Sequence, residues 1–155
     1  MTRRRLLQSG FTLIELILTV TVIAILVGLA VPLARNSVKR QKEADLRIAL
    51  REMRGAIDKY KMYSDAGQIQ VTLGTEGYPA KLEDLVEGVQ QVGQVDKKLK
   101  FLRKIPVDPM TNTAEWGMRA YQDETTSTSW GGQNVFDVYT KSEGIGLDGT
   151  KYSEW

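Results

Sequence analysis

The stretch GFTLIELILTVTVIAILVGLAVPLAR, residues 10 to 35, decides the fold of this protein. Within it, the 19 residues from Leu16 to Ala34 carry no charge, and a helix of that length reaches roughly 28 Å, close to the ~30 Å hydrocarbon core of a bilayer. This predicts one membrane-spanning helix. Arg3, Arg4 and Arg5 precede it and favour a cytoplasmic amino terminus, which leaves the remainder of the chain outside.

Two features separate this stretch from a cleaved secretory signal, the simpler alternative, whose cut would follow Pro32-Leu33-Ala34. The apolar stretch is longer than the ~7 to 15 residues of a usual signal core. Glu15 also places a carboxylate in its amino-terminal part, where a lipid-facing charge is costly and by default marks a functional site. Pro32 lacks an amide proton, so it predicts a kink or a local opening of the helix.

Beyond Arg35 the helical period continues, but the pattern becomes amphipathic. Apolar residues recur at spacings of three and four and predict one buried face: Leu46, Ala49, Leu50, Met53, Ala56, Ile57 and Tyr60. The charged residues lie largely off that stripe and are expected to form a solvated face: Glu43, Arg47, Arg51, Arg54 and Lys61. We therefore expect one long helix from about Phe11 to near Ala66, ending by Gly67.

Residues 67 to 155 are predicted to form a small globular head. Turn residues mark Gly74–Pro79, a short helix is expected over Ala80–Val86, and proline geometry makes Ile105–Pro109 extended up to a turn at Asn112. Two runs are typical of strands, Trp116–Tyr121 and Val135–Tyr139. A small antiparallel sheet packed on the long helix would bury the apolar stripe, which makes the fold class α+β.

Composition excludes most hydrolase and zinc-enzyme mechanisms. The 155 residues are 42% hydrophobic and 26% charged, which is ordinary for a folded domain, but they include no histidine and no cysteine. Thiolate metal sites, cysteine nucleophiles and Ser/His/Asp arrangements are therefore excluded, and no catalytic residue is assigned. The first basic run adjoins the apolar segment, so membrane orientation explains it better than binding of nucleic acid, which we do not expect.

The run Gly10-Phe11-Thr12-Leu13-Ile14-Glu15, with an arginine-rich leader before it and an apolar helix containing Pro32 after it, resembles the prepilin processing signal of the type IV pilin-like superfamily. The resemblance implies that a prepilin peptidase removes residues 1–10 by cleaving between Gly10 and Phe11, and then methylates the amine of Phe11. Residues 11–34 would first anchor the chain and later form a filament core. Residues 35–66 continue that helix as its amphipathic half.

Glu15 has a physical role in such a filament. Phe11 and Glu15 are four residues apart, hence on one helix face, and cleavage creates a positive amine at Phe11. Pairing of Glu15 with that amine on a neighbouring subunit would neutralise both charges and fix the axial register. The alternative is that the Glu15 side chain only extends to the lipid headgroups.

Three segments of the head resemble, in order, landmarks of the major pseudopilin of type II secretion systems: Tyr78–Leu85, Ile105–Asn112 and Val135–Tyr139. The resemblance implies a pilin-like structural subunit of a periplasmic pseudopilus that drives protein export. It also implies a single-pass inner-membrane precursor, a homopolymer, and minor pseudopilins and an inner-membrane assembly platform as partners. The alternatives are a major type IV pilin of a surface filament and a single-span anchored binding or sensor domain.

Major pseudopilins of this kind typically bind calcium in the carboxy-terminal loop, which corresponds here to Ser142–Gly149. Only Glu143 and Asp148 supply carboxylates in this loop, whereas calcium prefers six to eight oxygen ligands. A calcium site on Glu143 and Asp148 and a plain turn at Asp148-Gly149 both remain open on the sequence.

Overall fold

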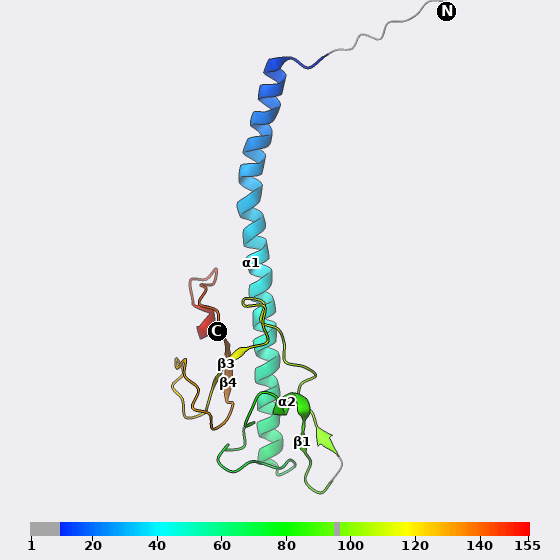
Figure 1. Ribbon diagram of the computed structural model, residues 1–155, viewed down its shortest axis with the longest axis vertical. Helices are drawn as coiled ribbons and strands as arrows, with labels where there is room; N and C mark the ends of the chain where they lie inside the picture. Colours follow the sequence, from blue (N-terminus) through cyan, green and yellow to red (C-terminus); the bar gives the residue numbers. More distant parts are fainter. Residues whose placement is uncertain (1–9, 95–96) are drawn as a thin grey trace, which may run out of the picture. The chain divides into compact units, whose positions relative to one another are not determined.

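The computed structural model describes residues 10–94 and 97–155, with the side chains of residues 29–34 left out. The chain divides into two compact units, one ending at Lys39 and the other running from Arg40 to Trp155. Figure 1 shows the order of the elements: α1 (Leu13–Asp65), α2 (Asp84–Glu87), β1 (Val89–Gln90), β2 (Lys98–Leu99), β3 (Trp116–Arg119), β4 (Asp137–Thr140) and the 3₁₀ helix η1 (Tyr152–Glu154).

The predicted long helix is present, and local chemistry sets both of its ends. The Thr12 hydroxyl accepts a hydrogen bond from the Glu15 amide at 3.3 Å, so Thr12 caps the first turn and α1 begins at Leu13 instead of Phe11. At the other end Gly67 adopts a φ of 66°, and the amides of Gly67 and Gln68 donate to the carbonyls of Ser64 and Tyr63. This Schellman arrangement ends the helix where the glycine predicted it.

The predicted apolar stripe forms the centre of the head core. All seven of its residues are buried: Leu46, Ala49, Leu50, Met53, Ala56, Ile57 and Tyr60. They pack in one cluster with side chains from the rest of the head: Ile69, Leu82, Leu85, Leu102, Trp116, Val135, Val138 and Tyr152. The second half of α1 and the head therefore share one core.

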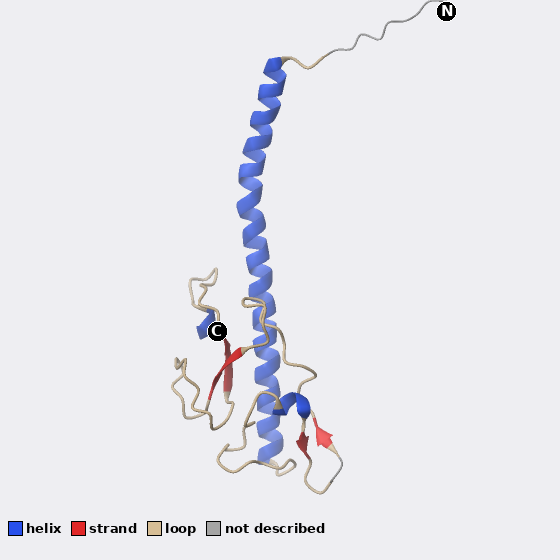
Figure 2. Ribbon diagram, viewed as in Figure 1, coloured by secondary structure: helices blue, strands red, loops and turns tan. Residues whose placement is uncertain are grey.

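The small antiparallel sheet is confirmed. Strands β3 and β4 pair from Trp116 opposite Thr140 to Arg119 opposite Asp137 (Figure 2). Gly117 lies opposite Tyr139, whose ring would come within 2.3 Å of a Cβ atom at position 117. Glycine is therefore required there for the tyrosine ring to cross the neighbouring strand.

Several predicted boundaries need correction. Strand β3 stops at Arg119, two residues before the predicted end, since Ala120 and Tyr121 bond to the side chains of Asp123 and Asn134. Strand β4 is shifted to Asp137–Thr140, and helix α2 is only four residues long. A second antiparallel pair, β1 with β2, was not predicted.

The prediction of a solvated charged face on α1 is wrong for Glu43, and it holds only in part for Arg54 and Lys61, whose side chains are 37% and 29% exposed. Glu43 is buried, and Arg54 is partly buried, where its guanidinium pairs with Asp137 at 2.6 Å. Arg47 contacts Asp148 of the carboxy-terminal segment at 3.4 Å. The helical period identified which face is apolar, but it did not show that a later segment covers part of the charged face.

Candidate functional site

The predicted processing site precedes the helix. Gly10 and Phe11 lie in a non-helical segment before α1, and the Phe11 side chain is 79% exposed. A Cβ atom at position 10 would meet no heavy atom within 4 Å. The bond between Gly10 and Phe11 is thus accessible backbone, as a scissile bond must be. The rest of the predicted leader, residues 1–9, lies outside the described part of the chain.

Glu15 occupies the first turn of α1. At that position a carboxylate is favoured by the partial positive charge of the helix amino terminus. Since Phe11 lies outside the helix, it does not share a helical face with Glu15 in this chain, which corrects the sequence argument. Among the described residues, no cation lies within ion-pair distance of the Glu15 carboxylate.

The first half of α1 exposes its apolar side chains. Ile17, Leu18 and Leu26 are 55%, 63% and 61% exposed. The hydroxyls of Thr19 and Thr21 donate to the carbonyls of Leu16 and Ile17 at 2.9 and 2.7 Å, so these two polar side chains are satisfied within the helix. A surface of this kind is stable only when other apolar groups cover it.

No helix in the described part of the chain combines the length and the apolar character needed to span a bilayer. The predicted span includes residues 29–34, whose side chains lie outside the described part. The helix assignment is continuous through Pro32, whose side chain falls in that gap, so the predicted kink stays a prediction.

Of the two candidate calcium ligands, Glu143 is exposed, and Asp148 is engaged by residues of its own chain. The Oδ1 atom of Asp148 accepts hydrogen bonds from the amide and the hydroxyl of Thr150 at 3.0 and 2.7 Å, and its Oδ2 atom lies 3.4 Å from the Arg47 guanidinium. These hydrogen bonds to Thr150, and secondarily the charge of Arg47, lower the pKa of Asp148. Within residues 10–94 and 97–155, no cluster of three or more Asp, Glu, His or Cys residues could hold a metal ion.

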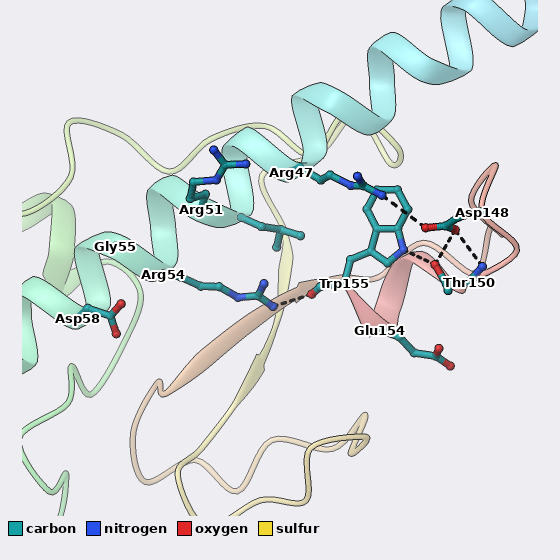
Figure 3. Close-up of a pocket in the computed structure, with 10 residues that line it drawn as sticks. Arg47, Arg51, Arg54, Gly55, Asp58, Asp148, Thr150, Glu154 and Trp155 are labelled. Atoms are coloured by element: carbon teal, nitrogen blue, oxygen red, sulfur yellow. Dashed lines mark hydrogen bonds and ion pairs between the residues drawn. The ribbon is translucent and has the colours of Figure 1, made fainter.

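An open groove of 670 Å³ lies between α1 and the carboxy-terminal segment (Figure 3). Arg47 and Arg54 extend from the helix to Trp155: the Arg47 guanidinium lies 4.1 Å from the centre of the indole ring, and Arg54 donates to the Trp155 carbonyl at 2.6 Å. Asp58 and Glu154 line the same groove. Both signs of charge are present, so the groove has no clear preference for an anion or a cation.

Sequence reasoning missed the buried polar groups of the head. Asp108 is fully buried, and its carboxylate accepts hydrogen bonds from the Met110 amide and the Thr140 hydroxyl. Glu43 accepts from the Tyr152 hydroxyl and the Leu147 amide at 2.9 and 2.8 Å. Burial and the bond to Glu43 raise the pKa of Tyr152 to about 12. No local sequence signal marks the contacts with Thr140, Leu147 and Tyr152, because these partners are distant in the chain.

Comparison with known proteins gives two matches. Residues 5–31 match the family model of the prokaryotic N-terminal methylation motif. The chain is also 32% identical, over 148 residues, to the type II secretion system core protein G of Pseudomonas aeruginosa, covering 92% of this chain and 85% of that protein. The chain belongs to the core protein G family of type II secretion systems. No solved structure matches it significantly.

Membership in the core protein G family makes the chain a type IV pilin-like protein and a type II secretion pseudopilin, as the motifs indicated. The methylation motif covers Gly10, Phe11 and Glu15, together with most of the apolar half of α1. The similarity to core protein G extends through the head as well. The features that place the chain in this family are therefore a processing motif and a scaffold, with no catalytic residue assigned.

Proposed function

We propose that this protein is the repeating structural subunit of a periplasmic pseudopilus that drives protein export by type II secretion. The observation that carries the proposal is the similarity to core protein G over nearly the whole chain, combined with the methylation motif at residues 5–31. A surface pilin shares the motif, but the similarity through the head favours the secretion system. An anchored sensor domain would need neither the methylation motif nor a head similar to that of core protein G.

The proposed route begins with a precursor held in the inner membrane by residues 11–34, with the head in the periplasm. A prepilin peptidase cleaves after Gly10 and methylates Phe11. Exposure of both residues ahead of α1 supports this step, since a protease needs an extended, accessible bond. The exposed apolar side chains of the first half of α1 then support transfer from lipid to a packed helical core in the filament, because both environments are apolar.

Glu15 gives the assembly its register in this proposal. Cleavage creates a cation at Phe11, beside the positive end of α1, where a cation is unfavourable. A carboxylate from a neighbouring copy offsets that charge, and no cation among the described residues of the same chain competes for Glu15. Removing either member leaves an unpaired charge in an apolar core, which is strongly destabilising. Minor pseudopilins and an inner-membrane assembly platform are the further partners that this route needs.

Deletion of the gene in its native host tests the proposal. We expect exported proteins to accumulate in the periplasm, with surface fibres unchanged, and we expect the wild-type gene on a plasmid to restore export. Normal export together with loss of surface fibres would instead identify a pilin.

A further inference from the structure

The carboxy-terminal segment closes on α1 through a buried carboxylate. Glu43 is only 9% exposed, and its Oε1 atom accepts hydrogen bonds from both the Tyr152 hydroxyl and the Leu147 amide. Those two donors lie more than 100 residues further along the chain. A buried carboxylate is tolerated when such donors satisfy it, and hydrogen bonds to a charged acceptor are stronger than neutral ones. We call Glu43, Leu147 and Tyr152 the C-terminal clasp.

Two arginines of α1 hold the end of the same segment. Arg47 lies over the Trp155 ring, and Arg54 bridges the Trp155 carbonyl and the carboxylate of Asp137 on β4. The Trp155 ring also packs edge-on against Tyr152, with 5.0 Å between ring centres. The segment from Leu147 to Trp155 is thus attached to α1 at several points along the helix.

The loop that joins the two donors of the clasp, Leu147 and Tyr152, is closed by contacts within the protein itself. The Gly146 amide donates to the Thr150 carbonyl at 2.7 Å, and the Trp155 indole donates to the Thr150 hydroxyl at 2.6 Å. Both oxygens of Asp148 are engaged, one of them beside the positive guanidinium of Arg47. A divalent cation at Asp148 would face that guanidinium, and the loop supplies only two carboxylates, Glu143 and Asp148, toward the six to eight oxygens that calcium prefers. The residues present do not fit calcium.

We infer that the C-terminal clasp replaces the calcium site that the resemblance to major pseudopilins implies, so that the head of this protein folds and is stable without a divalent cation. Glu43 supplies a fixed negative centre on α1, and the loop brings its donors to that centre. In a calcium-closed loop the arrangement is the reverse, because several loop oxygens surround a cation. This inference concerns the stability of the head and does not rest on the proposed function.

Thermal unfolding of the full-length processed protein in detergent tests the inference, with tryptophan fluorescence and near-ultraviolet circular dichroism as readouts. The wild-type midpoint is compared in excess calcium and in excess EGTA. We expect the same midpoint in both. A higher midpoint in calcium, with the increase abolished by Asp148→Asn, would overturn the inference and leave the export proposal untouched.

Variants of Glu43 provide the second part of the thermal-unfolding experiment. We expect Glu43→Ala to lower the midpoint by about 5 °C or more in both solutions, because the Tyr152 hydroxyl and the Leu147 amide lose their acceptor. The matched control is Glu52→Ala, an exposed glutamate on the same helix, which should change little. Equal effects of the two variants would contradict the clasp.

If Glu43→Ala does not fold, Tyr152→Phe provides the measurement. This variant keeps the ring and its packing against Trp155, and it removes one hydrogen bond to the carboxylate. We expect a smaller but calcium-independent decrease in midpoint. A wild-type midpoint for Tyr152→Phe, or one that calcium restores, would overturn the inference.

Discussion

The two halves of α1 are both rich in large apolar residues, but they differ in what covers them. Leu18 and Leu26 in the first half are 63% and 61% exposed, whereas Leu46 and Met53 in the second half are fully buried. The second half finds its partner in the head of the same chain. The first half has no cover among the described residues, and an apolar surface of this kind favours an apolar environment over water.

The two halves of α1 also differ in the surroundings of their carboxylates. Glu43, in the second half, is buried and satisfied by donors of its own chain. Glu15, in the first half, lacks a cationic partner among the described residues. In this account a carboxylate satisfied within the chain stabilises the fold, and a carboxylate without such a partner serves assembly.

Blocking the processing step should have the largest effect, because the first half of α1 could then no longer enter a filament. Replacing Gly10 by valine places a branched side chain next to the scissile bond, where glycine now leaves open space. We expect Gly10→Val to remain uncleaved and to be absent from filaments, as measured by the mass of the protein in membranes. The control is Gly28→Ala within α1, where a Cβ atom also meets nothing nearby and processing should be normal. Efficient cleavage of Gly10→Val would contradict the assigned site.

Neutralising Glu15 should leave processing intact and reduce assembly. We expect Glu15→Gln to lower the amount of assembled protein by about tenfold or more, since a loss of ~1.4 kcal/mol per contact already gives that factor. Filaments recovered after overexpression provide the measurement. Thr19→Ala is the control, because the Thr19 hydroxyl only bonds to a carbonyl of its own helix. Normal assembly of Glu15→Gln would reject the pairing with the Phe11 amine.

Truncating one leucine in each half of α1 should affect the stability of the head differently. We expect Leu46→Ala to reduce the free energy of unfolding of the head by about 2–5 kcal/mol, because it leaves a cavity in the core. Leu26→Ala should not change head unfolding, since that side chain is exposed. Denaturant unfolding of the full chain in detergent measures both. Equal losses would mean that the first half also has a partner within the chain.

Two arginines on the second half of α1 should also differ in how much they contribute to the free energy of unfolding. We expect Arg54→Ala to cost about 1–3 kcal/mol, because Asp137 and the Trp155 carbonyl lose a partly buried, charged donor. Arg51→Ala should stay within about 0.5 kcal/mol, since Arg51 is exposed. The same denaturant experiment applies. A neutral Arg54→Ala would show that Arg119, which also contacts Asp137, is sufficient.

The smallest expected effect is a dependence on alkaline pH. The pKa of Tyr152 is raised from its usual value near 10.0 to about 12 in the folded protein. The folded state then keeps a proton that the unfolded state loses, so this contribution to stability is complete below pH 10.0 and is lost as the pH rises through about 12. We expect Tyr152→Phe to reduce this alkaline decrease in unfolding midpoints measured against pH. An unchanged slope would contradict the assignment to Tyr152.

Periodicity and turn chemistry predicted the parts of the fold that depend on nearby residues. The apolar stripe of α1 proved buried at every predicted position, and the helix ended at the predicted glycine. Glu43 could not be assigned in this way, because its burial depends on Tyr152, 109 residues later. The strands β1 and β2 contain two residues each, too few for a recognisable alternation.

The residues of the candidate site show the same distinction between local patterns and contacts distant in the chain. Gly10, Phe11 and Glu15 could be predicted as candidates because the processing motif is contiguous in the sequence, and residues 5–31 match the methylation-motif family model. The sequence left calcium on Glu143 and Asp148 open, since it shows which carboxylates a loop contains but not that Thr150 and Arg47 occupy Asp148. Asp108 was missed as well, because the proline pattern around it gives no sign of burial beside Thr140.

The amino-terminal peptide of the protein from membranes of its native host shows whether the chain is cleaved before Phe11 and methylated there, on which the whole account depends. We predict, by mass spectrometry, a chain that begins at a methylated Phe11 and retains the apolar half of α1. A chain that begins at Met1, or after Ala34, would contradict the account, because the exposed half of α1 would then be a plain anchor or a discarded signal.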